Sequence, residues 1–248
     1  MSLFSFQGKI YIADRQPNGQ PGPLRWAFNV PQLQIKLGTT VKEHKESFSG
    51  QRLEDARLIT EVKAEVSMDL EDFDPQNLAM ALYGSAASVA AGSVTAEALP
   101  TVAVGDIIKL AQVGVSTVVV TDSAGTPATL VAGTHYAIES APGGLLKILN
   151  LGSYVQPFHV AYAHAGATNV AMFTTQATNK YLVGDLINTV DNSRVLVRLY
   201  QVRFDPLAQL DVIGDDFNKM TLAGSCLADL VNGADPTLGY FGRIEAGV

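Results

Sequence analysis

The side chains most often used in catalysis and metal binding are few in this chain and lie far apart along it. The histidines are His44, His135, His159 and His164, and the only cysteine is Cys226. A single thiol cannot supply a Cys-x-x-Cys pair, so we expect no structural zinc site, and a buried apolar role for the thiol. His159 and His164 are five residues apart in a strand-like segment, which predicts opposite faces rather than one metal ion. These residues predict neither a metal site nor a cofactor.

Four carboxylates lie close together, at Asp69, Glu71, Asp72 and Asp74. A calcium-binding EF-hand loop needs a glycine at its sixth position and a later bidentate glutamate, and this segment has neither. Helix capping by Asp74 and an acidic strand face explain the cluster more simply. The sequence also lacks a phosphate-binding glycine-rich loop, a Gly-x-Ser-x-Gly elbow and a His-Glu-x-x-His helix. We therefore expect a protein that is not an enzyme.

The element that holds this cluster is the clearest in the chain. Residues 61–71 alternate strictly between apolar and polar side chains, as expected for a strand with one face on a core and the other in water. The polar side is mostly acidic. A short helix over residues 75–83 should follow, because Asp74 can cap it, Pro75 suits its first position and Gly84 can end it in a left-handed conformation.

Strands dominate the rest of the chain. They are expected at residues 3–13, 24–37, 179–189, 194–204, 207–213 and 217–229, with Pro31 indicating an edge strand or a bulge. Residues 38–56 predict a long loop with charges of both signs. Those charged residues are Lys42, Glu43, His44, Lys45, Glu46, Arg52, Glu54 and Asp55.

A second region is inserted in this core. Residues 85–98 are rich in alanine, serine and glycine and predict a flexible linker. Short β-branched runs then follow at residues 106–113, 115–121, 135–140 and 145–149. The sequence thus predicts a mostly β fold, with a core formed by residues 1–98 and 167–248 and a small β lobe over residues 99–166.

Composition limits the classes of partner. The chain has 248 residues, with 24 acidic against 17 basic side chains, a net charge of −7 and a pI near 5.0. That balance argues against a protein that grips nucleic-acid phosphates through a basic patch. The N-terminus lacks the features of a secretory signal, and the apolar run 113–120 is too short to span a bilayer, so we expect synthesis in the cytoplasm and no membrane binding.

The alternating strand and the segments around it carry a family resemblance. Residues 58–84, preceded by the mixed-charge loop and followed near the C-terminus by 196–206, 212–217 and 224–229, resemble the major tail tube protein of long-tailed, non-contractile bacteriophages. The resemblance implies a β-sandwich or barrel subunit that forms hexameric rings, and rings that stack into a hollow tube. It also implies a structural role in the virion tail, with assembly in the host cytoplasm.

The resemblance assigns roles to individual residues. The side chains that would face the lumen are Gln32, Gln34, Lys36, Glu61, Lys63, Glu65, Ser67 and Asp69. The loop 38–56 would join successive rings, and its mixed charges suit pairing with a neighbouring ring. The implied partners are further copies of the chain, the tape-measure protein, the tail terminator and the baseplate or tip proteins. Double-stranded DNA would pass through the acidic lumen without specific binding.

Two alternatives share the predicted fold. One is a related tail component, either a tail terminator or the tube of a bacterial injection machine, which would differ in whether the ring polymerises. The other is a carbohydrate-binding or hydrolytic β-sandwich, since carboxylate pairs are common in the chain. That class needs exposed aromatic side chains beside paired carboxylates, whereas Trp26, the only tryptophan, is expected to pack beside a turn.

Overall fold

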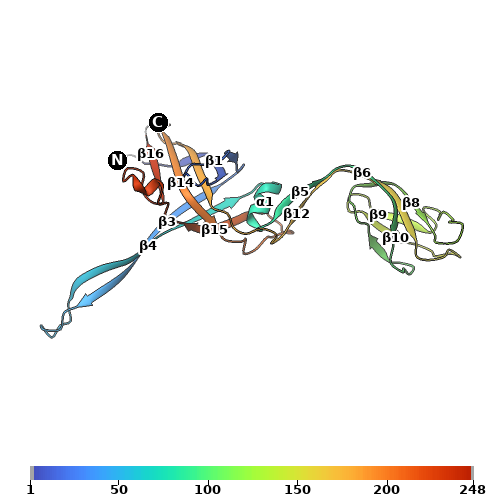
Figure 1. The fold of residues 1–248 in the computed structure, drawn as a ribbon, viewed down its shortest axis with the longest axis horizontal. Helices are drawn as coiled ribbons and strands as arrows, with labels where there is room; N and C mark the ends of the chain where they lie inside the picture. The colour runs from blue at the N-terminus through green and yellow to red at the C-terminus, as the bar shows by residue number, and fades with distance from the viewer. Residues whose placement is uncertain (1–2, 247–248) are drawn as a thin grey trace. The chain divides into compact units, whose positions relative to one another are not determined.

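The chain folds into two compact units, both built from antiparallel strands (Figure 1). The structure is a computed structural model that describes residues 3–246. Unit 1 contains the described residues up to Ser85 and from Val170 onward, and unit 2 is Ala86–Asn169. The mostly β class predicted from the sequence is confirmed. The second unit begins at residue 86 rather than at residue 99, because strands replace the predicted linker.

Unit 1 contains one eight-stranded sheet. Its strands run in the order β2-β1-β13-β14-β15-β4-β3, and β16 pairs with the other end of β14. Their bounds are β1 (Phe6–Asp14), β2 (Arg25–Trp26), β3 (Gln32–Lys45), β4 (Glu54–Leu70), β13 (Lys180–Asn188), β14 (Arg194–Phe204), β15 (Met220–Cys226) and β16 (Gly242–Ala246). The long strand β3 therefore lies at one edge of the sheet.

The alternation in β4 builds the core of unit 1. Ala64, Val66, Met68 and Leu70 are all buried and pack with apolar residues of β1, β13, β14 and β15. Burying a side chain such as Met68 stabilises the fold by about 1.5–3 kcal/mol. Side chains alternate between the two faces of a strand, so a shift of one residue would place the polar residues of β4 in this core. The cost of burying them fixes the register of β4.

Helix α1 (Pro75–Ala81) begins as predicted and ends differently. The Asp74 carboxylate accepts hydrogen bonds from the backbone N–H groups of Gln76 and Asn77, each at 3.1 Å. The left-handed residue after the helix is Tyr83, with φ of 49°, and not Gly84. Gly84 is needed for another reason: a Cβ there would lie 2.0 Å from the carbonyl oxygen of Ala171. The Tyr83 hydroxyl donates to the carbonyl of Phe204 at 2.6 Å, which holds the strained residue in place.

Three predictions for unit 1 are wrong. The loop predicted at 38–56 is mostly a β-hairpin, because β3 continues to Lys45 and β4 begins at Glu54. The strand predicted at 24–37 is two strands, β2 and β3, separated by an irregular segment that contains Pro31. The strand predicted at 207–213 is a loop, because β15 already occupies the neighbouring position beside the end of β14.

Unit 2 is a small sandwich with its own core. One sheet has the order β7-β10-β9 and the other β6-β11-β8. The bounds are β6 (Gly92–Ala98), β7 (Ile107–Lys109), β8 (Val115–Thr121), β9 (Tyr136–Ser140), β10 (Leu145–Ile148) and β11 (His159–His164). Phe158, Leu146 and Val160 are among the fully buried side chains between them. The chain enters and leaves this unit through a two-stranded ribbon of β5 (Ser85–Val89) and β12 (Ala167–Ala171).

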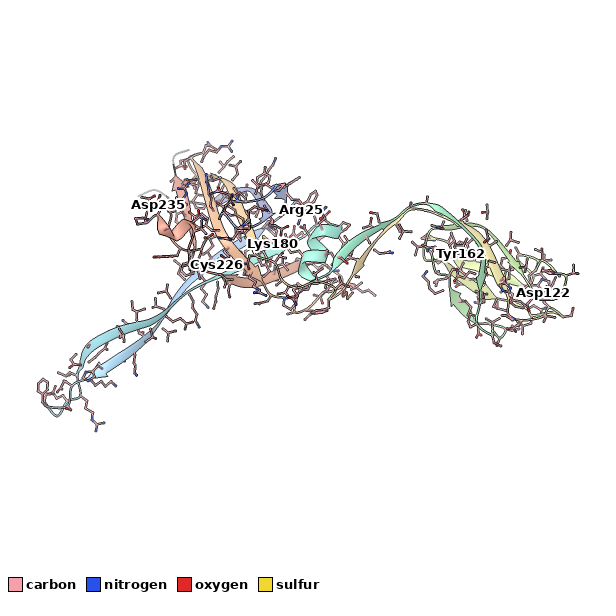
Figure 2. All side chains as sticks on the ribbon, in the orientation of Figure 1. Arg25, Asp122, Tyr162, Lys180, Cys226 and Asp235 are labelled. Atoms are coloured by element: carbon pink, nitrogen blue, oxygen red, sulfur yellow. The ribbon has the colours of Figure 1, made fainter. Side chains whose placement is uncertain are left out.

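Two buried polar groups organise unit 2, and both are labelled in Figure 2. The Asp122 carboxylate accepts hydrogen bonds from the backbone N–H groups of Ala128 at 2.7 Å and Val155 at 3.2 Å. The first of these bonds contributes most to a pKa below the ordinary range for Asp122. The Tyr162 hydroxyl donates to Glu97 at 2.5 Å, and burial raises its pKa. These hydrogen bonds satisfy the buried polar groups and hold the neighbouring loops in place.

Candidate functional site

The eight residues predicted to face a lumen lie together on one face of unit 1. In the antiparallel pairing of β3 with β4, Gln32 lies opposite Asp69, Gln34 opposite Ser67 and Lys36 opposite Glu65. Further along, Lys63 lies opposite Gly38 and Glu61 opposite Thr40. Directly opposed residues share a face of the sheet, so the structure brings all eight predicted side chains together. We call this set the polar face.

Each carboxylate of the polar face has a lysine partner. The Lys36 ammonium lies 3.6 Å from Glu65, and that of Lys63 lies 3.2 Å from Glu61. The third, Asp69, is buried and pairs with Lys219, which sequence reasoning did not identify, at 2.6 Å. The eight residues of the polar face include three acids and two lysines, and Lys219 adds a third lysine beside Asp69, so this surface is close to neutral rather than strongly acidic.

Asp69 is held more tightly than the other two acids. One carboxylate oxygen accepts from Lys219 and the other from the Thr221 hydroxyl at 2.7 Å. Burial raises the pKa of Asp69, but these two hydrogen bonds outweigh it and leave the pKa below its ordinary value. The remaining two pairs are exposed, so each adds about 0–1 kcal/mol to stability. Asp69 thus contributes to the join between β4 and β15, whereas Glu61 and Glu65 are available to solvent.

The opposite face of the hairpin is apolar and becomes exposed beyond the core. Leu33 packs on the core, whereas Leu37 is 74% exposed. On the same face of β4, Ile59 and Val62 are also exposed. Figure 1 shows this part of β3 and β4 projecting from the sheet as a two-stranded ribbon. An exposed apolar surface of this kind is stabilised when it is covered.

Most of the charged residues predicted to lie in a loop are on the two paired strands at the far end of the hairpin. Glu43 lies opposite Arg57, His44 opposite Ala56 and Lys45 opposite Glu54, while Lys42 lies opposite Leu58. The His44 ring lies 2.5 Å from the Asp55 carboxylate. Opposite charges placed across antiparallel strands stabilise the pairing, which explains why this charged segment is a ribbon rather than a loop. Arg52 lies in the remaining turn, before β4 begins.

Glu46 organises the tip of the hairpin. Its carboxylate accepts hydrogen bonds from the backbone N–H groups of Phe48 and Ser49, each at 2.8 Å, and of Leu53 at 3.1 Å. The Ser49 hydroxyl also donates to it. That hydroxyl contributes most to lowering the pKa of Glu46 to about 2. The turn so ordered presents Phe48, which is 89% exposed, at the end of the ribbon.

Both edges of the sheet in unit 1 are open within the described part of the chain. Strand β3 has a partner only on its β4 side. At the other edge, the two-residue strand β2 covers only Tyr11 and Ile12 of β1. The outward backbone groups of β1 from Phe6 to Lys9 therefore have no strand partner among the residues described. Open edges with exposed backbone groups can pair with another chain.

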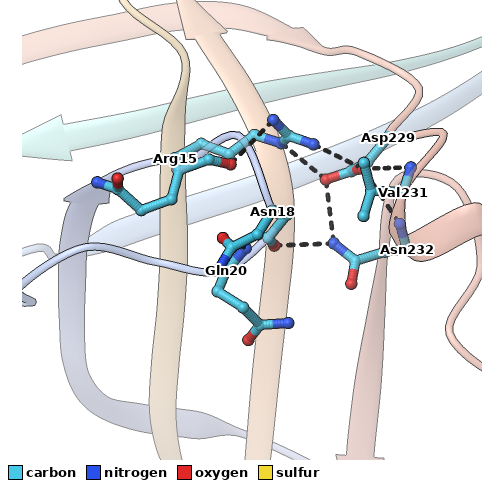
Figure 3. Close-up of polar contacts among 8 residues, drawn as sticks. Arg15, Asn18, Gln20, Asp229, Val231 and Asn232 are labelled. Carbon is cyan, nitrogen blue, oxygen red and sulfur yellow. Dashed lines mark hydrogen bonds and ion pairs between the residues drawn. The ribbon is translucent and has the colours of Figure 1, made fainter.

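A buried ion pair ties the N-terminal and C-terminal segments of unit 1 together (Figure 3). The Arg15 guanidinium binds both carboxylate oxygens of Asp229, at 2.8 and 2.9 Å. The same carboxylate accepts from the backbone N–H of Val231 at 2.9 Å. The Asn232 amide donates to it at 3.0 Å and to the Gly19 carbonyl at 2.9 Å. Chiefly because of Arg15, the pKa of Asp229 falls to about 2. Local sequence patterns missed this pair, since its members are far apart in the chain.

The fold gives the thiol and the acidic cluster singled out in the sequence separate structural surroundings. Cys226 is buried, and burial raises its pKa to about 11, so the thiol is neutral at physiological pH. The acidic cluster diverges: Glu71 and Asp72 both bind Asn29, and Asp74 caps α1. Between residues 3 and 246 no group of three potential metal ligands converges on one point. The same residues include no helix with the length and apolarity needed to cross a bilayer.

Comparison with known proteins leaves the function open. A family model described as "Protein of unknown function UCP028589" matches residues 3–245. No curated protein matches the chain. The matched span includes both units, so the inserted lobe is part of what defines the family.

Proposed function

The chain belongs to this family of unknown function, and we propose that it is a structural subunit that assembles with copies of itself into closed rings, which stack into a tube. The observation that carries the proposal is the long β3–β4 hairpin. One of its strands is an open edge, one face is polar and nearly uncharged, and its projecting end is apolar on the other face. The sequence resemblance makes the tail tube of a bacteriophage virion the specific form of the proposal.

The open edges support ring formation. If β3 of one copy pairs with β1 of the next, the sheet continues from copy to copy. Such a contact joins two different surfaces, so it closes into a ring when the rotation between copies allows it. Ring closure removes both edges at once and yields a continuous barrel, which suppresses uncontrolled aggregation. The hexameric number comes from the resemblance alone.

In that barrel the polar face would line the lumen. A wall rich in free cations would bind phosphates at many points and hold DNA in place. On the polar face, Lys36 and Lys63 are each beside a glutamate, and Lys219 is beside Asp69. The part of the lining formed by β3 and β4 therefore presents balanced charge rather than the acidic surface expected from β4 alone. Balanced charge suits the transient passage of DNA without specific binding.

The projecting hairpin is suited to joining one ring to the next. Its tip exposes Phe48, and its shaft exposes Leu37 and Leu58. Burying side chains of this size contributes about 1.5–3 kcal/mol each, and every ring would bury several sets. The tape-measure, terminator and tip proteins are the further partners in this proposal, at the lumen and at the two ends of the tube.

Negative-stain electron microscopy of the concentrated, purified protein tests the proposal. We expect hollow tubes or stacked rings with a lumen wide enough for duplex DNA. A single ring that never stacks would favour the related tail components, such as a terminator. A protein that remains monomeric at all concentrations, including with tail-tip proteins added as initiators, would contradict the proposal.

A further inference from the structure

The face of the unit 1 sheet that includes the polar face carries an excess of positive charge at its other end, on β1, β13, β14 and β16. Through the register of β1, β2, β13, β14 and β16, Lys9 shares this face with Arg194, Arg198 and Arg243. The carboxylates on the same face are Asp185 and Glu245. Four cations against two carboxylates give this surface a net positive charge, although the chain as a whole has a net charge of −7. We call it the cationic face.

The ion pairs within the cationic face leave part of its positive charge unmatched. Arg198 and Arg243 share the single carboxylate of Glu245, at 3.1 and 2.6 Å. Lys9 has no carboxylate partner within the described residues and lies instead over the ring of Trp26, 5.3 Å from its centroid. Trp26 itself is 43% exposed, contrary to the prediction that it packs away beside a turn. Exposed aromatic and arginine side chains on one surface are typical of protein interfaces.

The loop between β14 and β15 has the complementary chemistry. Residues 211–217, which we call the acidic loop, contain Asp211, Asp215 and Asp216 and no basic residue. Ile213 and Phe217 in the same loop are each 95% exposed. Large apolar side chains presented between carboxylates are stabilised by a partner that is both apolar and cationic.

The start of the segment that carries the acidic loop is anchored. The backbone N–H of Leu207 donates to the carbonyl of Ala81 at 2.8 Å. Leu207 and Leu210 also pack against the core of unit 1. The loop is therefore presented from a fixed base, and its exposed side chains are an arrangement of the fold rather than a loose terminus.

The acidic loop and the cationic face lie at opposite ends of β14. The loop leaves the strand after Phe204, whereas Arg198 is six residues earlier and Arg194 ten residues earlier. At about 3.3 Å per residue, these separations along the strand are roughly 20 and 33 Å. The loop base at Leu207 is bound to α1 at the far end, which places the cationic face of the same copy out of reach. A second copy of the chain offers the same cationic face to the loop of the first.

We propose that the acidic loop of one copy docks on the cationic face of a neighbouring copy. The contact rests on the proposed function, because it requires that copies meet. It joins two different surfaces, which is the arrangement that generates rings or open filaments rather than isolated pairs. Salt should weaken it, since exposed charges are screened over about 8 Å at physiological ionic strength.

Charge reversal with mixing tests the contact. One variant carries Asp215→Lys and Asp216→Lys in the acidic loop, and the other carries Lys9→Glu and Arg194→Glu in the cationic face. Each variant alone brings like charges together at the contact. Measured by sedimentation, its assembly should need a concentration at least about tenfold higher than that of the wild type. In an equimolar mixture, alternation of the two variants restores opposite charges at every contact, so the mixture should assemble as the wild type does. Glu139→Lys, on an exposed position of unit 2, is the control.

Trp26 gives a second measurement that does not depend on polymer formation. It is the only tryptophan, so its fluorescence reports on the cationic face. A synthetic peptide of residues 205–219 should change the emission of the wild-type protein, and the same peptide with Asp215→Lys and Asp216→Lys should not. Reversed variants that assemble normally would overturn the contact while leaving the proposed function intact. A wild type that neither assembles nor responds to the peptide would overturn both.

Discussion

At the scale of single residues, the carboxylates of this protein are of two kinds. Some are bonded within the fold and stabilise it, and others are exposed to solvent. Asp229 and Glu46 each accept several hydrogen bonds and have a pKa of about 2. Glu61 and Glu65 are exposed and have only a lysine neighbour. Carboxylates of the first kind lose stabilising interactions when they are protonated or replaced, whereas those of the second kind tolerate substitution.

Asp229→Asn should destabilise unit 1. The substitution leaves the buried Arg15 guanidinium without its counter-charge, and removing one partner of a buried pair costs about 3 kcal/mol of unfolding free energy. Denaturant titration measures the loss. Because the folded pKa of Asp229 is about 2, below its unfolded value of about 3.9, its contribution is present above pH 4 and is lost as pH falls toward 2. The difference between wild type and variant should therefore shrink over that range.

Asp235→Asn is the matched control for that prediction. Its exposed carboxylate bonds only within the turn, to the N–H and hydroxyl of Thr237. We expect a change of about 0.5 kcal/mol or less. Equal losses of unfolding free energy from the two substitutions would contradict a stabilising role for the Arg15–Asp229 pair.

Glu46→Gln should loosen the hairpin tip without unfolding the protein. The amide has one acceptor oxygen and no charge, so it cannot satisfy the N–H groups of Phe48, Ser49 and Leu53 together. Hydrogen exchange at these three amides should become faster, while exchange in β4 near Met68 stays unchanged. In the wild type the low pKa keeps the tip ordered above about pH 4.3, and order is lost as pH falls through about 2. Unchanged exchange at the tip would contradict the role given to Glu46.

At the scale of elements, the long hairpin combines two parts with different purposes. From Ala64 onward β4 contributes to the core, while the part beyond the Thr40–Glu61 pair contributes nothing to the core of unit 1. Removing residues 40–51 alone, as for a loop, would leave the first residues of β4 without a partner strand. A deletion that respects the register must remove both strands equally.

Replacing residues 41–60 with Asn-Gly should abolish stacking and preserve folding. Thr40 and Glu61 remain opposite each other, and Asn-Gly suits the two-residue turn that then joins them. We expect a free energy of unfolding within about 1 kcal/mol of the wild type, because every core residue is retained. Electron microscopy should show rings or smaller species and no tubes. Normal tubes from this variant would contradict the role of the hairpin in joining rings.

At the scale of the whole molecule, two independent cores raise the question of which unit assembles. Unit 2 has its own buried cluster and two sheets, and every surface invoked for assembly lies in unit 1. Within unit 1 the two points of attachment are close together, since Ser85 and Thr174 share a hydrogen bond of 3.0 Å between hydroxyl groups. Each unit can therefore be made without the other, which tests which of them assembles.

Joining Ser85 to Val170 through Gly-Gly, in place of residues 86–169, should leave a unit 1 that folds and still forms tubes. Residues 86–169 expressed alone should unfold cooperatively, because a core such as that around Phe158 needs no contribution from unit 1. Electron microscopy and thermal unfolding check the two parts. Loss of assembly by a folded unit 1 would show that the inserted lobe takes part in the contacts.

The charge balance of the proposed lumen makes a further prediction for the assembled tube. Glu61→Lys with Glu65→Lys removes the partners of Lys63 and Lys36 and adds two cations per subunit. Tubes should still form, but they should retain duplex DNA in co-sedimentation, with retention that falls steeply as salt rises. Glu61→Gln with Glu65→Gln is the control for loss of the acids alone. Equal DNA retention by wild type and lysine variant would indicate that these residues face away from the lumen.

The sequence by itself determined the features that depend on local pattern. Alternation in β4 defined both its buried face and its polar face, and Asp74 with Pro75 defined the start of α1. The same local rules failed for residues 38–56, where charge content suggested a loop. Cross-strand partners decide whether such a segment is a strand, and those partners are not visible in a linear pattern.

Only the tertiary structure decided which distant residues meet. Lys219 neutralises Asp69 and Arg15 pairs with Asp229 because β15 lies beside β4 and the C-terminal segment returns to the end of β1. The net charge of the polar face, the open edges and the opposite placement of the acidic loop and the cationic face follow from strand order. Strand order is set by packing and hydrogen bonding over the whole sheet, and these are collective properties that no short stretch of sequence contains.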